Sequence, residues 1–185
     1  MVEAAWVAFW GFWLLILLIA FSYLLPRTVS VRRQVLVEAP STDVFFQLND
    51  ARNWPQWFPW EQQNEETSVT CEGSETGKGA TRKWKSASGT SGQQVIVDVD
   101  PPDYLRMSLE IDRYGGGHAE WFIEPKGESA RLVTCVMRLA IGTTLRKRWR
   151  AVFLRSQVAE ELEEGLQALK AAAESSRNAK SSEPV

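Results

Sequence analysis

Between residues 67 and 141 the sequence consists of short strand-like runs separated by turn residues. In residues 93–100 apolar and polar side chains alternate, and Gly115, Gly116 and Gly117 separate two later runs. Alternation with a period of two is typical of half-buried strands, and tight turns join antiparallel neighbours. The pattern predicts an antiparallel meander of six strands, at residues 67–72, 79–85, 93–100, 104–113, 118–124 and 130–141.

A further strand precedes this meander and a long helix follows it. Residues 29–39 alternate in the same way, and residues 143–174 change to the spacing of an amphipathic helix. Two short helical segments, 42–50 and 51–60, lie between the first strand and the meander. One face of such a sheet must be covered, and the long helix is the only predicted element able to do so. We therefore expect an α+β fold in which a seven-stranded curved antiparallel sheet surrounds a long C-terminal helix, with a cavity where the two diverge.

The N-terminal residues 4–25 contain no charged side chain, and Pro26 and Arg27 follow them. A helix of that length would cover about 33 Å, enough for a hydrocarbon core of about 30 Å. Arg27, Arg32 and Arg33 follow the run and no Lys or Arg precedes it, which favours a cytoplasmic position for the rest of the chain. The run predicts a single-pass membrane protein with a transmembrane anchor at 1–28, a folded domain at 29–174 and a disordered tail at 175–185. A cleaved signal peptide and a buried helix are the alternatives.

The composition argues against several classes of function. The formal net charge is −2, the chain has one histidine, His118, and its two cysteines, Cys71 and Cys135, lack metal-ligand spacing. A nearly balanced charge gives no indication of nucleic-acid binding. Histidine-based metal centres need more ligands than one histidine supplies. We expect no metal, no cofactor and no catalytic constellation, with His118 at an exposed turn; a lone general base is the alternative for this residue.

The most specific motif runs from residue 39 to residue 60. It consists of Ala39-Pro40, Val44-Phe45, Asn49-Asp50 and Trp54-Pro55-Gln56-Trp57-Phe58-Pro59-Trp60. Together with residues 77–80, Trp84 and residues 163–170, it resembles the START-like helix-grip superfamily (SRPBCC), in its polyketide cyclase/dehydrase and lipid-transport branch. The resemblance covers about residues 30–174 and implies a helix-grip fold with an internal apolar pocket. It does not imply a reaction, because members of this superfamily bind lipids, steroids, polyketides or proteins.

Large aromatic and apolar side chains are the candidates for lining such a pocket. Ligand sites are concave and mostly apolar, although large rings also fill ordinary cores. The predicted lining residues are Trp57, Trp60, Trp84, Met107, Trp121, Trp149 and Phe153. One of the strand arginines Arg82, Arg106 and Arg138 could point into the pocket and hold a carboxylate or enolate oxygen; surface charge is the alternative.

These observations favour a membrane-anchored domain that binds or transports an apolar small molecule, such as a lipid, a quinone or a polyketide-like compound. A cyclase or dehydrase acting on such a ligand and a protein-interaction adaptor are the alternatives. A basic cluster opens the last helix, where the helix dipole disfavours cations. It consists of Arg146, Lys147, Arg148 and Arg150. We expect this cluster to contact anionic lipid, with a solvated helix face as the alternative.

Overall fold

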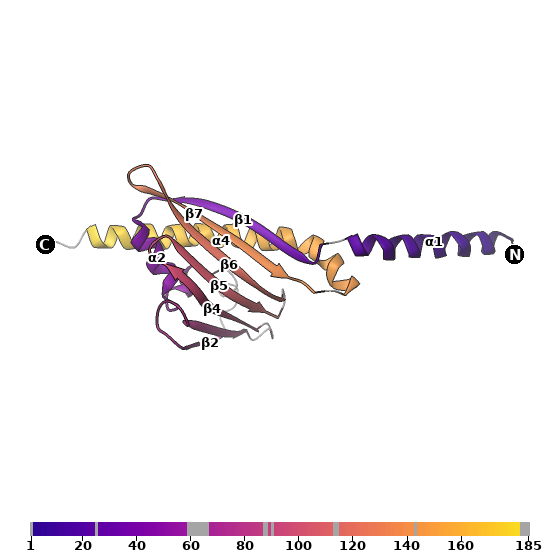
Figure 1. Cartoon of the computed structure of the whole chain (residues 1–185), viewed down its shortest axis with the longest axis horizontal. Helices are drawn as coiled ribbons and strands as arrows, with labels where there is room; N and C mark the ends of the chain where they lie inside the picture. The colour runs from indigo at the N-terminus through magenta and orange to yellow at the C-terminus, as the bar shows by residue number, and fades with distance from the viewer. Residues whose placement is uncertain are drawn as a thin grey trace.

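The computed structural model describes residues 2–24, 26–58, 67–86, 89, 91–112, 115–142 and 144–181. Its strands form a curved sheet around a long C-terminal helix, and the N-terminal helix extends away from one end of this assembly (Figure 1). The elements in chain order are α1 (Val2–Leu24), β1 (Thr28–Val37), α2 (Ser41–Asn49), the 3-10 helix η1 (Trp54–Gln56), β2 (Thr67–Glu72), β3 (Thr81–Ser86), β4 (Ser91–Asp100), β5 (Tyr104–Ile111), β6 (Gly115–Lys126), β7 (Ala130–Ala140) and α4 (Leu145–Ser181).

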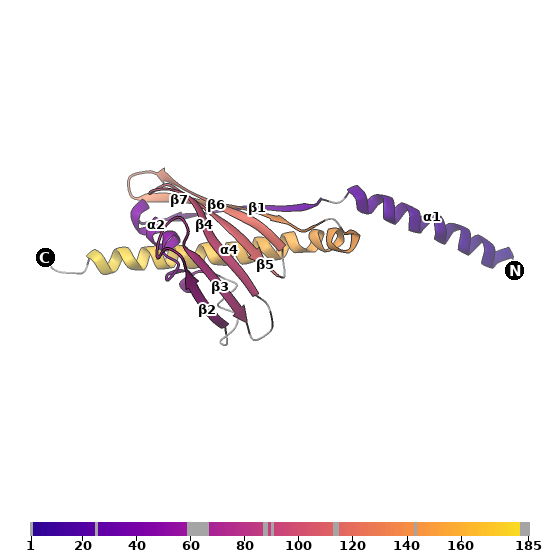
Figure 2. The ribbon, with the colours of Figure 1, turned by 60° about the horizontal axis from the view of Figure 1, so that its bottom comes forward.

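The seven strands form one antiparallel sheet with the order β1-β7-β6-β5-β4-β3-β2. Strands β2 to β7 follow one another as a meander, as the alternating runs predict (Figure 2). The first strand then pairs with the last, from Thr28 opposite Ala140 to Val37 opposite Arg131. The predicted α+β class and the curved seven-stranded antiparallel sheet with its C-terminal helix are confirmed.

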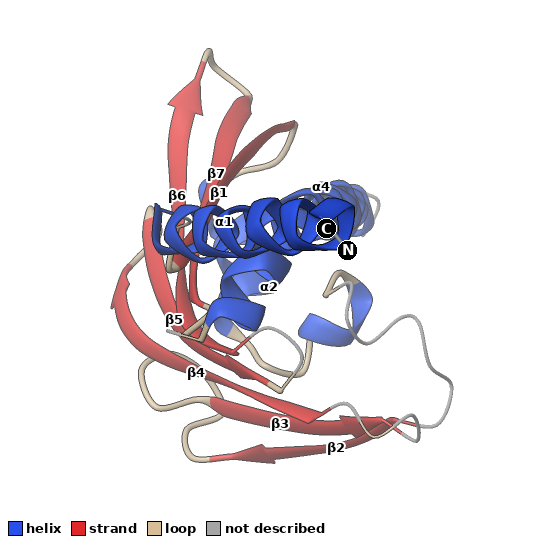
Figure 3. Cartoon of the chain, turned by 90° about the vertical axis from the view of Figure 1, so that its right-hand side faces the viewer, coloured by secondary structure: helices blue, strands red, loops and turns tan. Residues whose placement is uncertain are grey.

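Helix α4 packs on the face of the sheet formed by the odd-numbered residues of β1. Val31 and Val35 are buried on that face, and Arg33 between them forms an ion pair with Glu163 of α4, with 3.5 Å between Nε and Oε2. Helices α2 and α4 both lie on this concave side (Figure 3). The buried stripe of α4 consists of Ala151, Leu154, Val158, Leu162, Leu166, Leu169 and Ala173.

Polar contacts attach the far end of α4 to the end of β1. The backbone N–H of Glu38 donates to Oε1 of Glu174 at 2.9 Å, and Nη1 of Arg177 donates to the carbonyl oxygen of Glu38 at 2.5 Å. Arg177 lies beyond the predicted helix end at residue 174, and the helix continues to Ser181. The C-terminal turns of α4 therefore pack against the start of the α2 segment instead of ending at the sheet.

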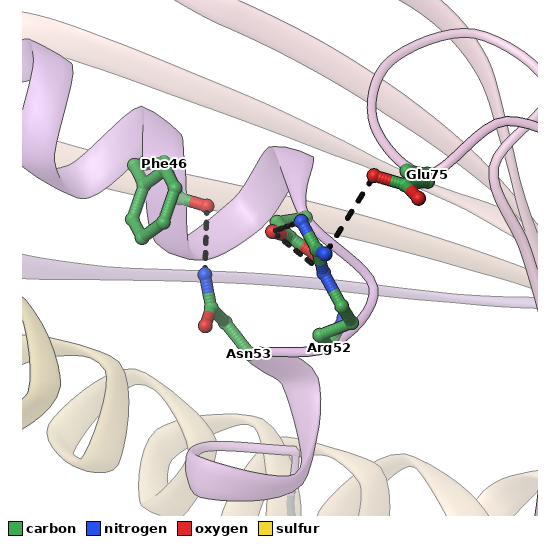
Figure 4. A network of polar contacts seen from close by, with 5 residues as sticks. Phe46, Arg52, Asn53 and Glu75 are labelled. Atoms are coloured by element: carbon green, nitrogen blue, oxygen red, sulfur yellow. Dashed lines mark hydrogen bonds and ion pairs between the residues drawn. The ribbon is translucent and has the colours of Figure 1, made fainter.

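An ion pair orders the turn between α2 and η1 (Figure 4). Oδ2 of the buried Asp50 accepts a hydrogen bond from Nη2 of Arg52 at 2.7 Å, and Oδ1 accepts one from the Arg52 backbone N–H at 2.9 Å. Arg52 also lies 3.6 Å from Glu75, and Nδ2 of Asn53 donates to the carbonyl oxygen of Phe46 at 3.3 Å. This network sets the direction in which the chain enters η1.

Helix α1 forms as expected, but the prediction that it spans a membrane is wrong. In the described part of the chain, no helix combines the length and the apolar character that crossing a membrane requires. This finding contradicts the anchor over residues 4–25, the single-pass topology and the cytoplasmic orientation. The prediction rested on an absence of charge, yet indole rings are amphipathic and Ser22 and Tyr23 are polar. Arg33, used to assign the orientation, instead pairs with α4.

Truncation of a buried α4 side chain should destabilise the sheet–helix contact. Leu166 is fully buried, so Leu166→Ala should lower the free energy of unfolding by about 2–5 kcal/mol. Chemical denaturation followed by circular dichroism measures this loss. Gln167→Ala, at an exposed neighbouring position, is the control and should change the free energy by less than about 0.5 kcal/mol. Equal effects of the two substitutions would contradict the packing described.

The Asp50–Arg52 pair predicts a pH-dependent stability. Hydrogen bonds from Arg52 lower the pKa of Asp50. A lowered folded-state pKa stabilises the fold above the ordinary aspartate value of about 3.9, and this contribution is lost as the pH falls through the folded-state pKa. The difference in unfolding free energy between wild type and Asp50→Asn should therefore be largest near neutral pH and shrink below about pH 4. The difference in unfolding free energy between wild type and Arg52→Gln should shrink over the same pH range. A difference that does not change with pH would contradict the role given to the Asp50–Arg52 pair.

Candidate functional site

A row of aromatic rings crosses the concave face of the sheet. The ring centroids of Trp121 and Trp57 lie 5.4 Å apart, those of Trp57 and Phe58 lie 5.7 Å apart, and those of Phe58 and Trp84 lie 5.9 Å apart. All four side chains are buried and meet edge to face. The row joins β6 to β3 through the residues that follow η1, so side chains distant in the sequence form one apolar surface.

Hydrogen bonds and one glycine determine where these rings lie. Nε1 of Trp57 donates to the carbonyl oxygen of Gln47 in α2 at 3.1 Å, which ties the ring to the end of that helix. Trp84 lies directly over Gly92, its partner across β3 and β4. A Cβ atom at position 92 would come within 2.2 Å of the Trp84 ring. The closeness of this approach explains why the sequence has a glycine in the strand.

A polar pair lies on the same concave face. Gln94 of β4 is completely buried, and neither its amide nitrogen nor its amide oxygen has a hydrogen-bond partner among the described residues. Arg82 stands directly opposite it on β3 and is 1% exposed, with Nη1 donating to the carbonyl oxygen of Ala51 at 3.1 Å. Nε1 of the buried Trp121 also lacks a partner within the described ranges. Buried polar groups normally find partners, and each unpaired one costs about 1–3 kcal/mol.

The structure brings together some of the predicted pocket residues and separates others. Trp57, Trp84 and Trp121 belong to the aromatic row, and Met107 is buried on the same sheet face. Trp149 lies elsewhere, with Nε1 donating to Oγ of Ser22 in α1 at 2.7 Å.

Two further predicted residues do not join the row. Phe153 is 71% exposed, because the buried stripe of α4 passes through Leu154 instead. Trp60 lies outside the described residues. The same is true of the side chains of the basic cluster, residues 146–148 and 150, so their contact with anionic lipid remains a prediction.

Of the three strand arginines, only Arg82 points to the concave side. Arg138 lies on the outer face, where Nη1 contacts Oε2 of Glu120 at 2.5 Å and Nε2 of His118 at 3.4 Å. Arg106 lies opposite Glu120 on that outer face. Partial burial lowers the pKa of His118, and the nearby Arg106 charge adds to this effect. The prediction of a turn at His118 is wrong, because this residue lies within strand β6. Its side chain is on the face of the sheet opposite Gln94.

Gln94 was not among the predicted site residues, because the alternation of Val95, Val97 and Val99 places it on the polar face of the strand. Gln94 and Ile96 share a strand face, and Ile96 is an inward residue. A β-bulge between Ile96 and Asp98 shifts the register of β4, so only the structure places the Gln94 amide at an inward position. Within the described ranges, no group of three or more His, Cys, Asp or Glu residues is arranged to hold a metal ion.

Comparison with solved structures shows the same fold in several proteins of low sequence identity. The aromatase/cyclase Zhui from Streptomyces sp. R1128 has a TM-score of 0.60 and 17% identity over 80% of this chain and 94% of its own. A START superfamily protein from Mycobacterium smegmatis has a TM-score of 0.60 and 14% identity over 79% and 97% of the two chains. Truncated norcoclaurine synthase from Thalictrum flavum has a TM-score of 0.57 and 11% identity over 77% and 91%.

The sequence comparison defines the family. No curated protein sequence matches the chain at a significant level. The family model described as polyketide cyclase / dehydrase and lipid transport matches residues 28–174, which contain every strand of the sheet and most of α4. This chain therefore belongs to the polyketide cyclase/dehydrase and lipid-transport family.

Proposed function

We propose that the chain binds an apolar small molecule carrying a carbonyl or carboxylate oxygen, on the concave side of the sheet. Cyclase activity and lipid transport, which the family description names, both require the binding of a hydrophobic ligand. The observation that carries the proposal is Gln94, a fully buried amide whose two polar atoms have no partner among the described residues. A ligand oxygen would satisfy this amide nitrogen, which has no partner in the described part of the chain.

The surroundings of Gln94 suit such a ligand. Arg82 supplies a permanent positive charge beside the amide, and a guanidinium pairs well with a carboxylate or an enolate oxygen. Trp84 and Leu109 are buried on the same sheet face, so they offer apolar contact to the rest of the ligand. In a low-dielectric interior each hydrogen bond to the ligand oxygen is stronger than in water.

The described residues favour ligand binding without a catalysed reaction. Acid–base catalysis needs a titratable group within reach of the ligand, and His118 lies on the opposite face of the sheet from Gln94. The alternative is a cyclase-type reaction in which Arg82 and Gln94 stabilise an enolate oxygen while the ligand's own groups react. An adaptor that binds only protein would show no saturable small-molecule binding.

Replacement of Gln94 should separate binding from stability. In Gln94→Leu the unpaired amide is lost, so the unliganded protein should become more stable by about 1–3 kcal/mol. Its affinity for dodecanoate should fall at least tenfold, because the carboxylate loses the amide donor and keeps only Arg82. Displacement of 1-anilinonaphthalene-8-sulfonate by dodecanoate measures affinity, and chemical denaturation measures stability.

Gln93→Leu is the matched control for this experiment. Gln93 is the neighbouring residue of β4 and has its side chain on the other face of the sheet. It should leave dodecanoate binding unchanged. A Gln94→Leu variant that loses stability and keeps its affinity would show that the amide has only a structural role.

We also propose the lipid contact of the basic cluster, which rests on the sequence. The first turn of α4 contains no acidic residue that could neutralise the cluster. The full chain should sediment more with phosphatidylglycerol vesicles than with phosphatidylcholine vesicles at low salt, and the difference should disappear at about 1 M salt, where the Debye length is about 3 Å. Glutamine at positions 146, 147, 148 and 150 should abolish the difference. Equal sedimentation with both lipids at low salt would contradict the proposal.

A further inference from the structure

A second concavity lies on the outer face of the sheet, over β1, β6 and β7. Its volume is about 330 Å³, and it is lined by Arg32, Glu120, Phe122, Glu124, Thr134, Val136 and Arg138. Val31 and Arg33, the neighbours of Arg32, face α4, so this groove points away from the helix. The volume is within the range of small-molecule sites.

The strand register places the groove residues in a regular array. Val136 forms the floor, with Arg32 opposite it on β1 and Glu120 opposite it on β6. Thr134 is the next residue of β7 on the same face, and Phe122 stands opposite it on β6. The floor is therefore a valine, a threonine and a phenylalanine side by side, which offers apolar contact around one hydroxyl.

Thr134 is the buried polar group of this groove. The residue is 2% exposed, and its Oγ1 has no hydrogen-bond partner in the described part of the chain. A hydroxyl can both donate and accept a hydrogen bond, so burying it without a partner leaves both functions unsatisfied and lowers the stability of the fold. Thr134 lines the groove, so its hydroxyl is the polar group beneath a molecule bound there.

The groove contains one ion pair and two further charged side chains, which lie at its opposite ends. Arg138 and Glu120 neutralise each other at 2.5 Å. Arg32 and Glu124 have no ion-pair partner among the described residues. Arg32, Val136 and Glu120 form one row across the strands, and Glu124 lies four residues further along β6. Strand β7 separates β1 from β6. From strand spacing, their Cα atoms are roughly 16 Å apart, with the floor between them.

We propose that this outer groove binds an elongated zwitterion. Arg32 pairs with its carboxylate, Glu124 with its ammonium group, and Val136 and Phe122 contact the apolar chain between the charges. Oγ1 of Thr134 hydrogen-bonds a polar atom of the ligand. Because residues on opposite faces of a sheet do not share a ligand, this site is separate from the one proposed at Gln94.

Binding of 6-aminohexanoate to the full chain tests the proposal. The probe carries both charges on a flexible apolar chain, and isothermal titration calorimetry measures its affinity. Saturable binding is expected, and hexanoate and hexylamine, which each have one charge, should bind at least tenfold more weakly. Arg32→Gln and Glu124→Gln should each weaken binding at least tenfold, and Thr134→Val about threefold or more.

Three control variants make the outcome decisive. Arg155→Gln and Glu110→Gln change exposed charges elsewhere and should leave 6-aminohexanoate binding unchanged. Gln94→Leu should also leave it unchanged while weakening dodecanoate binding, so failure of one site is distinguishable from failure of the other. Absence of saturable binding, or equal affinity for hexanoate and 6-aminohexanoate, would overturn the proposal, as would binding that survives both Arg32→Gln and Glu124→Gln.

Discussion

The packing of α4 against the concave face of β1 is the contact on which the rest of the structure depends. An antiparallel sheet with one apolar face is stable only when another element covers that face. Helix α4 supplies the cover with a stripe from Ala151 to Ala173. The Arg33–Glu163 ion pair adds a polar contact between the strand and the helix. Because β1 also pairs with β7, this one contact joins the two ends of the folded domain.

The polar groups of the concave side oppose the stability that this packing provides. Arg82 and Gln94 are buried at inward positions, where apolar side chains are usual. Nη1 of Arg82 donates to the Ala51 carbonyl oxygen. Gln94 keeps two unpaired atoms among the described residues. A protein retains such a cost where the groups serve binding, and this is why we assign the candidate site to these residues.

The alternation of side chains across a strand gives the sheet two independent chemical surfaces. In β7 the inward residues include Val133 and Cys135, while Thr134 and Val136 line the outer groove. Ligands on the two faces would therefore contact different residues of the same strands. Burial alone raises the pKa of Cys135 far above its ordinary range, so this thiol contributes apolar packing and no reactivity to the inner surface.

Local sequence patterns determined the order and type of the elements. The alternating runs predict every strand of the sheet, and the helical spacing after residue 143 predicts α4, because both signals depend on neighbouring side chains. The motif around Trp54 and Trp57 also predicts the family. Helical periodicity does not show which of two adjacent apolar residues faces inward. Phe153 was therefore predicted to face inward, whereas Leu154 is the buried side chain.

Only the tertiary structure decided which polar residues lie together on the inner face of the sheet. Arg82, Arg106 and Arg138 are equivalent as strand arginines in the sequence, and the register alone places Arg82 beside Gln94 on the inner face. The apolar sequence of residues 4–25 predicts a helix but not what surrounds it. In the structure Ser22, near the C-terminal end of α1, accepts a hydrogen bond from Trp149 of α4. Burial, pairing and the sharing of a face depend on contacts between residues distant in the chain, and such contacts exist only once the sheet has closed around α4.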